Sequence, residues 1–248
     1  GGYTVYNEPH VFKWYQKLIP ACIRHGLAKF VSSIPFFFRG QSFIIRGSRH
    51  TEEKYIGNAF MFTKEDKEKL LKDPSIATRP QDLCKKYYSN VKDYDEETKM
   101  QYLDINLWMV GDILLKADRM SMANSLELRV PFLDKEVFKV ASKLKTKFRV
   151  NRKNTKYAMR LAAMRHLPES TAQKEKLGFP VPTRVWLRDE KYYNIVKDMF
   201  YSDTCKKFFN PDPLVKLLDD HYLGKWDNSR KIWTIYIFLR WYNIYFAD

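Results

Sequence analysis

Long apolar segments are absent from the 248-residue sequence. The longest apolar runs, residues 34–38 and 232–239, fall well short of the roughly 20 residues that a membrane-spanning helix needs. The first residues also lack the pattern of a secretory signal, in which a charged region precedes an apolar one. We therefore expect a cytoplasmic protein that has no membrane partner.

Cysteine is scarce as well, and the common catalytic motifs are missing. Cys22, Cys84 and Cys205 lie far apart and are odd in number, which is typical of reduced thiols rather than of a disulfide framework or a zinc site. The five histidines are scattered, so we expect no metal site. The sequence contains no G-x-x-x-x-G-K-[ST], G-x-G-x-x-G, G-x-S-x-G or H-E-x-x-H. Pattern alone therefore offers no complete active site.

Acidic residues are outnumbered: 44 Lys and Arg face 29 Asp and Glu, a net charge of +15. Residues 143–160 hold eight basic side chains and no acidic one. The simplest interpretation is a solvated lysine-rich surface, and a surface facing phosphates is the alternative. No helix-turn-helix, RRM, KH or zinc-finger pattern is present, so nucleic acid is not an expected partner. A basic nucleic-acid-binding module is kept as a hypothesis from a different functional class.

Apolar residues recur at helical spacing along most of the chain and predict one mostly α-helical unit without a linker. We expect helices within 11–30 (broken at Pro20), 63–71, a segment from 95, 103–127, 135–144, 154–167, 183–200, 213–223 and 229–245. Thr63 and Asp66 form a capping-box pattern, Asp134 is an expected N-cap, and Asn154 or Thr155 is expected to cap the helix that follows. Residues 148–150 are the one weak candidate strand, and 171–182 are expected to form a loop.

Three segments carry polar residues in patterns that an ordinary core does not need. Residues 118–134 place five ionisable groups in and beside an apolar helix: Asp118, Arg119, Glu127, Arg129 and Asp134. The structural interpretation is a partly buried charge network that fixes how this helix meets its neighbour. The sequence alone does not separate this from a role in a site.

The other two segments are short. Residues 174–182 place lysines before a loop rich in glycine and proline, where a held lysine could stabilise a phosphate or an oxyanion. An ordinary exposed loop lysine is the alternative. At the start of the chain, the paired glycines before Tyr3 allow a close backbone approach, and the tyrosine could donate a hydrogen bond.

Taken together and in order, these segments resemble the synthetase domain of the glutamine-hydrolysing asparagine synthetase family. Residues 111–122 (GDILLKADRMSM) are similar to the family's DDLLxKxDRMSM, and residues 126–134 (LELRVPFLD) to LExRVPFLD. Residues 155–160 (TKYAMR), 167–169 (LPE) and 176–182 (KLGFPVP) are similar to TKYLLR, LP and KxGFxVP. Each motif is weak alone, and the ordered set is specific. It covers residues 103–188 well and the remainder only in general character.

The resemblance implies an ATP-dependent amidation. Aspartate's side-chain carboxylate attacks the α-phosphate of Mg-ATP, pyrophosphate leaves, and ammonia released from glutamine attacks β-aspartyl-AMP to give asparagine and AMP. The implied cofactors are ATP and Mg²⁺, and the implied partners are aspartate, ammonia from glutamine and the upstream part of the same enzyme.

The resemblance also implies residue roles. The family's lysine in KxGF stabilises developing charge and maps to Lys176, whereas Lys174 does not match. The family's tyrosine after the paired glycines lies beside the adenylate and maps to Tyr3. Five further residues map to positions that organise the site: Asp118, Arg119, Glu127, Arg129 and Asp134.

The sequence departs from the family pattern in what it lacks. The nucleotide-binding SGGxDS loop, the acidic run before GGY and the nucleophilic cysteine of the glutaminase domain are all absent. We therefore expect residues 1–248 to be the carboxyl-terminal portion of a longer enzyme, inactive alone. In fold, this would be the distal helical part of an α/β ATP-pyrophosphatase domain of the adenine nucleotide α-hydrolase type, whose sheet lies upstream. A β-lactam synthetase or a peptide-cyclising or peptide-amidating relative is the alternative within the same chemistry.

Overall fold

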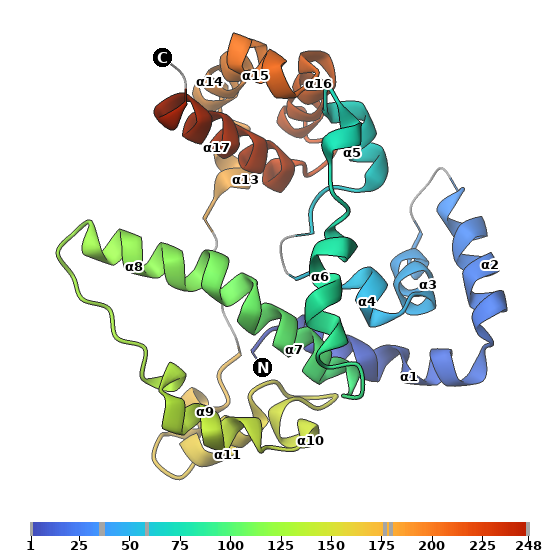
Figure 1. Cartoon of the computed structure of the whole chain (residues 1–248), viewed down its shortest axis with the longest axis vertical. Helices are drawn as coiled ribbons and strands as arrows, with labels where there is room; N and C mark the ends of the chain where they lie inside the picture. Colours follow the sequence, from blue (N-terminus) through green and yellow to red (C-terminus); the bar gives the residue numbers. More distant parts are fainter. Residues whose placement is uncertain (1, 35–37, 58–59, 176–177, 179–180, 247–248) are drawn as a thin grey trace. The chain divides into compact units, whose positions relative to one another are not determined.

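The computed structural model describes residues 2–34, 38–57, 60–175, 178 and 181–246, and it is mostly helical (Figure 1). This confirms the predicted helical character. In the described part of the chain, β pairing is confined to two isolated bridges, Leu71 with Phe209 and Val150 with Thr155. Within these same residues no helix is both long enough and apolar enough to cross a membrane.

The chain divides into two compact units, each discontinuous in sequence, where the sequence predicted one. Unit 1 comprises Gly1–Ala59 and Pro80–Lys176, and unit 2 comprises Phe60–Arg79 and Leu177–Asp248. The sequence did not reveal this division because the crossings at 59–60 and 79–80 are not marked by stretches rich in glycine, serine or proline, and the third crossing falls within 171–182, which was expected to be a loop inside a single unit.

Unit 1 holds the segments 111–122, 126–134, 155–160 and 167–169 that resemble the synthetase family, whereas residues 177–182 of the last such segment belong to unit 2. Its elements are η1 (Thr4–Asn7), α1 (Glu8–Leu18), α2 (Ala21–Ser32), α3 (Gln41–Ser48), α4 (Thr51–Lys54), α6 (Pro80–Ser89), α7 (Glu96–Asn106), the π-helical turn η3 (Met109–Leu114), α8 (Leu115–Met122), η4 (Pro131–Leu133), α9 (Lys135–Ser142), α10 (Thr146–Arg149), α11 (Tyr157–Ala163) and α12 (Glu169–Ala172). Pro20 separates α1 from α2 as predicted, since proline cannot continue a helix. Asp95 caps α7 by accepting a hydrogen bond from the Thr98 amide, 2.8 Å away.

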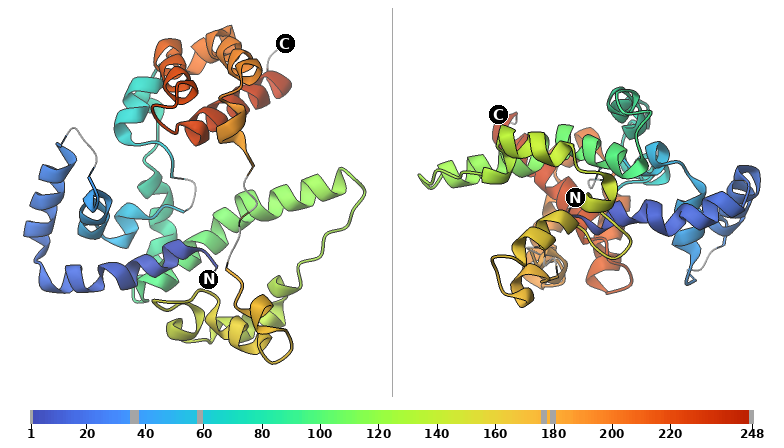
Figure 2. Two further views of the ribbon diagram at one scale, coloured as in Figure 1. Left: turned by 180° about the vertical axis from the view of Figure 1, so that it is seen from behind. Right: turned by 90° about the horizontal axis from the view of Figure 1, so that it is seen from below.

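The helix predicted over 103–127 is broken and ends early. A π-helical turn interrupts it at 109–114, and α8 stops at Met122. Ser125 adopts a left-handed backbone with φ 56°, and its amide donates to the Met122 carbonyl, so the chain leaves the helix there and not at Glu127. Figure 2 shows α8 and the loop after it projecting beyond the other helices of unit 1 before the chain returns to α9.

Two further local predictions in unit 1 are wrong. Residues 146–149 form α10 instead of a strand, and Val150 makes only a single bridge to Thr155. That bridge removes Thr155 from the role of helix cap. α11 begins instead after Lys156, which has a left-handed backbone (φ 56°) and no side-chain cap.

The core of unit 1 is small and rich in tyrosine. It contains Tyr6, Tyr55, Cys84, Tyr88, Met100, Leu103 and Val150. These residues come from η1, the end of α4, α6, α7 and the end of α10, so the core ties the first residues of the chain to segments about 100 residues away. The buried Cys84 agrees with a reduced structural thiol.

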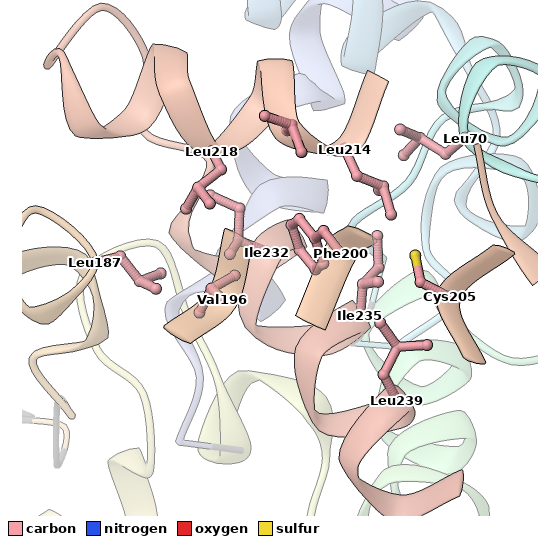
Figure 3. Packing of buried hydrophobic residues seen from close by; sticks show 11 residues of the cluster. Leu70, Leu187, Val196, Phe200, Cys205, Leu214, Leu218, Ile232, Ile235 and Leu239 are labelled. Atoms are coloured by element: carbon pink, nitrogen blue, oxygen red, sulfur yellow. The ribbon is translucent and has the colours of Figure 1, made fainter. Parts of the chain in front are cut away.

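Unit 2 is a cluster of helices around an aliphatic core. Its elements are α5 (Lys64–Leu70), η2 (Pro74–Ile76), α13 (Thr183–Trp186), α14 (Glu190–Tyr201), α15 (Asp203–Phe208), α16 (Pro211–Tyr222) and α17 (Ser229–Tyr245). The capping box at Thr63 and the bounds of the last helix are confirmed. Figure 3 shows Phe200 packed among leucine and isoleucine side chains of α16 and α17. Trp233 and Trp241 of α17 are 39% and 46% exposed.

Candidate active site

Tyr3, one of the two predicted catalytic residues, lies at the edge of the unit 1 core. It precedes η1 and is half-buried, with its ring edge-on to that of Tyr6 at 6.0 Å between centroids. The indole Nε1 of Trp108 donates a hydrogen bond to the Tyr3 hydroxyl oxygen across 3.1 Å. The other predicted catalytic residue, Lys176, lies outside the described residues.

A buried carboxylate underlies Tyr3. Asp104 of α7 is 3% exposed, and its Oδ2 accepts hydrogen bonds from the hydroxyls of Tyr6 and of Tyr55, the latter at 2.6 Å. The Tyr88 hydroxyl in turn donates to the Tyr55 carbonyl. Oδ1 of Asp104 has no hydrogen-bond partner among the described residues.

The environment decides the protonation of this group. Burial raises the pKa of the Asp104 carboxyl above its ordinary value, and the hydrogen bonds from Tyr55 and Tyr6 offset this only in part. Burial and the contact with Asp104 also raise the pKa of Tyr6 and Tyr55, so both hydroxyls stay protonated and donate. Asp104 and the two tyrosines thus form a buried hydrogen-bonded cluster, which holds the amino-terminal segment through Tyr6.

Sequence reasoning missed Asp104 and Trp108. The sequence did hold a signal for these two residues: Asp104 follows the buried Leu103, and Trp108 lies four residues later on the same helical face. The partners could not be read from the sequence, because Tyr6 and Tyr3 lie 98 and 105 residues away.

The predicted site-organising residues of α8 are exposed. The side chains of Asp118 and Arg119 both face solvent, and neither forms an ion pair with another described residue. Asp118 makes a local backbone contact, in which its carbonyl accepts from the Ser121 hydroxyl at 3.0 Å. The structure therefore does not bring these two residues to Tyr3.

The remaining three predicted residues are exposed as well. Arg129 and Glu127 form an ion pair at 2.7 Å with side chains 82% and 70% exposed. Asp134 caps α9 by accepting from the Glu136 amide at 2.8 Å, which confirms the predicted cap. The expected partly buried charge network is wrong, because these five residues lie on a segment that buries none of its side chains.

Residues 110–140, which include this segment, expose many apolar side chains, and we call these side chains the 110–140 surface. Its members are Val110, Leu115, Met120, Met122, Leu126, Leu128, Val130, Phe132, Leu133, Val137, Phe138 and Val140. Isolated exposed apolar residues are ordinary on protein surfaces, but so many within one stretch of chain favour an interaction site.

Arg160 of α11 holds the chain that leads to Lys176. Its Nη1 donates to the carbonyls of Ala172 and Lys174 at 3.1 and 3.0 Å, and its Nε donates to the Thr155 carbonyl at 3.0 Å. A guanidinium presents several fixed donors, so one side chain joins two loops here. This role was not predicted, although Arg160 lies within the TKYAMR segment.

The basic segment 143–160 has two kinds of side chain. Arg149 is half-buried and donates to Gln101, Thr98 and Thr146, while Arg160 binds backbone carbonyls. The other six are exposed, which favours the interpretation as a solvated surface. No group of three or more metal-ligating side chains occurs within the part of the chain that the structure describes.

Comparison with known proteins places these features in a family. Residues 1–243 match the family described as asparagine synthase. The chain belongs to the asparagine synthase family. It is 44% identical to asparagine synthetase [glutamine-hydrolyzing] 1 of Bacillus subtilis over 246 residues, which are 98% of this chain and 38% of that protein. It is 38% identical over 245 residues to a putative asparagine synthetase [glutamine-hydrolyzing] of Mycobacterium tuberculosis, covering 99% of this chain and 37% of the relative.

The match extends beyond the predicted region. The expected resemblance was good over 103–188, whereas the family match also includes nearly all of the remainder. A more distant relative, asparagine synthetase [glutamine-hydrolyzing] 3 of B. subtilis, is 28% identical over 147 residues. The chain spans less than two fifths of the length of the first two relatives. No solved structure shows a significant match to the chain.

Proposed function

We propose that the chain is the carboxyl-terminal, helical portion of a synthetase domain that amidates aspartate at the expense of ATP. The observation that carries the proposal is the family match over residues 1–243 together with 44% identity to a glutamine-hydrolysing asparagine synthetase. The aspartate carboxylate would attack the α-phosphate of ATP and release pyrophosphate. Ammonia from glutamine would then attack the acyl carbon of β-aspartyl-AMP, and AMP would leave.

Within this mechanism the chain contributes Tyr3 and Lys176. Tyr3 stands at the edge of a buried core, where it contacts Trp108 and Tyr6, and its hydroxyl would lie beside the bound adenylate. The Lys176 ammonium would stabilise negative charge on pyrophosphate and on the tetrahedral intermediate. Arg160 supports this by fixing the carbonyls of Ala172 and Lys174, just before the lysine. We propose that Asp118, Arg119, Glu127, Arg129 and Asp134 organise the site once the rest of the domain is present.

ATP and Mg²⁺ would be held mainly by residues upstream of this chain. The described residues offer no cluster suited to a metal ion, and the sequence has no glycine-rich phosphate loop. Mg²⁺ bound to ATP would neutralise the charge of the departing pyrophosphate. We further propose that the enzyme is cytoplasmic, and that the parallel sheet of an α/β ATP-pyrophosphatase domain lies in the upstream part.

The 110–140 surface supports an upstream partner within the same enzyme. The five predicted site-organising residues lie among exposed apolar side chains, and the relatives carry more than half of their length outside the matched part. We propose that the upstream half of the synthetase domain covers this surface. The 248-residue chain alone would therefore neither bind ATP tightly nor form asparagine.

The test is pyrophosphate release by the full-length protein with ATP, ammonia and aspartate. We expect aspartate-dependent release that falls at least 100-fold in a Lys176→Ala variant, since removing one oxyanion stabiliser typically costs a factor of 10²–10³. Lys174→Ala is the matched control, because this exposed lysine lies two residues away and offers only its backbone carbonyl to Arg160. Release with other carboxylates but not with aspartate would contradict the proposed substrate and favour a β-lactam synthetase-like or peptide-amidating activity.

A further inference from the structure

The start of the chain, around η1, packs against the end of α7 in unit 1. Asp104 and Trp108 lie four residues apart on α7 and the turn after it, and therefore on one helical face. Tyr3 and Tyr6 lie three residues apart at a 3₁₀ turn, where side chains at this spacing eclipse. Two hydrogen bonds join the pairs: Trp108 donates one to Tyr3, and Tyr6 donates one to Asp104.

The inner pair of this arrangement is anchored in the core. Asp104, Tyr6 and Tyr55 are each 3% exposed, and the carboxylate ties both tyrosines together. The outer pair, Tyr3 and Trp108, is only half-buried. The outer pair is therefore held by a rigid base and lies where a ligand can reach it.

The hydrogen bond between Trp108 and Tyr3 influences whether the Tyr3 hydroxyl donates or accepts in a further contact. An indole N–H can only donate, so the Tyr3 oxygen must accept in its contact with Trp108. A phenolic hydroxyl has one proton, and that proton is turned away from the indole. The contact with Trp108 thus favours donation by the Tyr3 hydroxyl towards a ligand, and the acceptor that forms the strongest such hydrogen bond is an anionic oxygen, as in a phosphate or a carboxylate.

We propose that Trp108 is a positioning residue that orients the Tyr3 hydroxyl as a donor to an anionic oxygen of the acyl-adenylate. The inference rests on the proposed function, which brings an adenylate to this site. Trp108 touches Tyr3 and not the reacting atoms, so it acts through the tyrosine. Its effect depends on the Tyr3 hydroxyl being present.

A double-mutant cycle in the full-length enzyme tests this, with pyrophosphate release as the readout. Trp108→Phe removes the donor and is expected to lower kcat roughly 3- to 10-fold, the range of one hydrogen bond, with a smaller change in the KM for aspartate. Tyr3→Phe is expected to lower kcat by at least as much. The double variant is expected to match Tyr3→Phe within a factor of 2.

Independent effects would overturn the proposal. If Trp108→Phe lowers kcat equally in the wild-type and Tyr3→Phe backgrounds, the tryptophan has a packing role only. A wild-type kcat in Trp108→Phe would also overturn it. Tyr102→Phe is the matched control, because Tyr102 lies on α7 and loses only an exposed hydrogen bond from Asn90. This control is expected to stay within 2-fold of the wild type.

A second measurement does not depend on activity. In ¹⁵N-labelled protein, the indole N–H signal of Trp108, assigned by its loss in Trp108→Phe, is expected to shift in Tyr3→Phe and to stay unchanged in Tyr102→Phe. An unmoved signal in Tyr3→Phe would refute the contact itself. If the wild type releases no pyrophosphate with aspartate, the proposed substrate fails separately, and the cycle is run with the carboxylate that does support release.

Discussion

Lys231 of α17 donates to both oxygens of the Asp66 carboxylate, each at 2.7 Å, although the two residues are 165 positions apart. Asp66 also accepts from the Thr63 amide at 2.9 Å and so completes the capping box of α5. One carboxylate therefore starts a helix and binds that helix to the last helix of unit 2. Burial opposes ionisation, but the hydrogen bonds from Lys231 and Thr63 lower the pKa of Asp66.

Lys231→Met is expected to destabilise α5 relative to the wild type by about 1 kcal/mol at pH 7, because the pair is only partly buried. The pKa of Asp66 is lower in the folded state, so the stabilisation is present above the unfolded value of about 4 and is lost as the pH falls through the folded value. The difference between variant and wild type should shrink below about pH 4. Hydrogen exchange of the α5 amides measures it.

Lys64→Met is the control for this prediction. Lys64 lies on the same helix, and its pair with Glu68 is long at 3.5 Å and well exposed. A change of more than about 0.5 kcal/mol in this control would show that lysine removal from α5 has a general effect and would contradict the specific role of Lys231.

Asp104→Leu is expected to destabilise unit 1 by about 2–5 kcal/mol, since it leaves the buried hydroxyls of Tyr6 and Tyr55 without an acceptor. Asp104→Asn keeps an acceptor oxygen and should cost about 1 kcal/mol or less. Chemical denaturation measures both values. A similar loss in the two variants would show that side-chain shape, and not the acceptor, matters.

The Asp104 carboxyl is expected to make the stability of unit 1 depend on pH with the opposite sign to that of Asp66. The pKa of Asp104 is raised in the folded state, so its contribution to stability is fully present below the unfolded value of about 4 and is lost as the pH rises through the folded value. Asp104→Asn removes this loss and should gain stability relative to the wild type as the pH rises from about 4 to about 7. A stability difference that is flat across this range would refute the prediction.

Arg160→Lys is expected to lower kcat of the full-length enzyme about 10-fold, because an ammonium cannot hold the carbonyls of Thr155, Ala172 and Lys174 together. Steady-state pyrophosphate release measures this. Arg165→Lys serves as control, since this arginine lies shortly after α11 with its side chain exposed to solvent. Unchanged activity in Arg160→Lys would remove Arg160 from the support of the lysine loop.

The 110–140 surface should be covered in the full-length enzyme. Phe132→Cys is expected to give a thiol that alkylates at least 10-fold more slowly than the thiol of Ile76→Cys, although the two parent side chains are 69% and 73% exposed in this chain. Peptide mass spectrometry separates these thiols from the exposed native Cys22. Equal rates would mean that no upstream segment covers Phe132.

The local features of the fold followed from the sequence. Pro20 separates two helices, the capping box at Thr63 and the cap at Asp134 are where predicted, a helix starts next to Asp95 as expected, and the last helix spans 229–245. Each of these depends on hydrogen bonds that close within about four residues, so the nearby sequence is sufficient. The ordered motifs also identified the family, because each motif is a short run of neighbouring residues whose order along the chain is read directly from the sequence.

Tertiary structure alone decided the surroundings of the candidate site. The sequence could not show that Asp104 lies beneath Tyr6 and Tyr55, or that Trp108 bonds Tyr3, because these partners are 49 to 105 residues apart and meet only when the core packs. Nor could it show that Asp118 and Arg119 face solvent. A helical pattern predicts which face is apolar, but only the neighbouring elements determine whether anything covers that face.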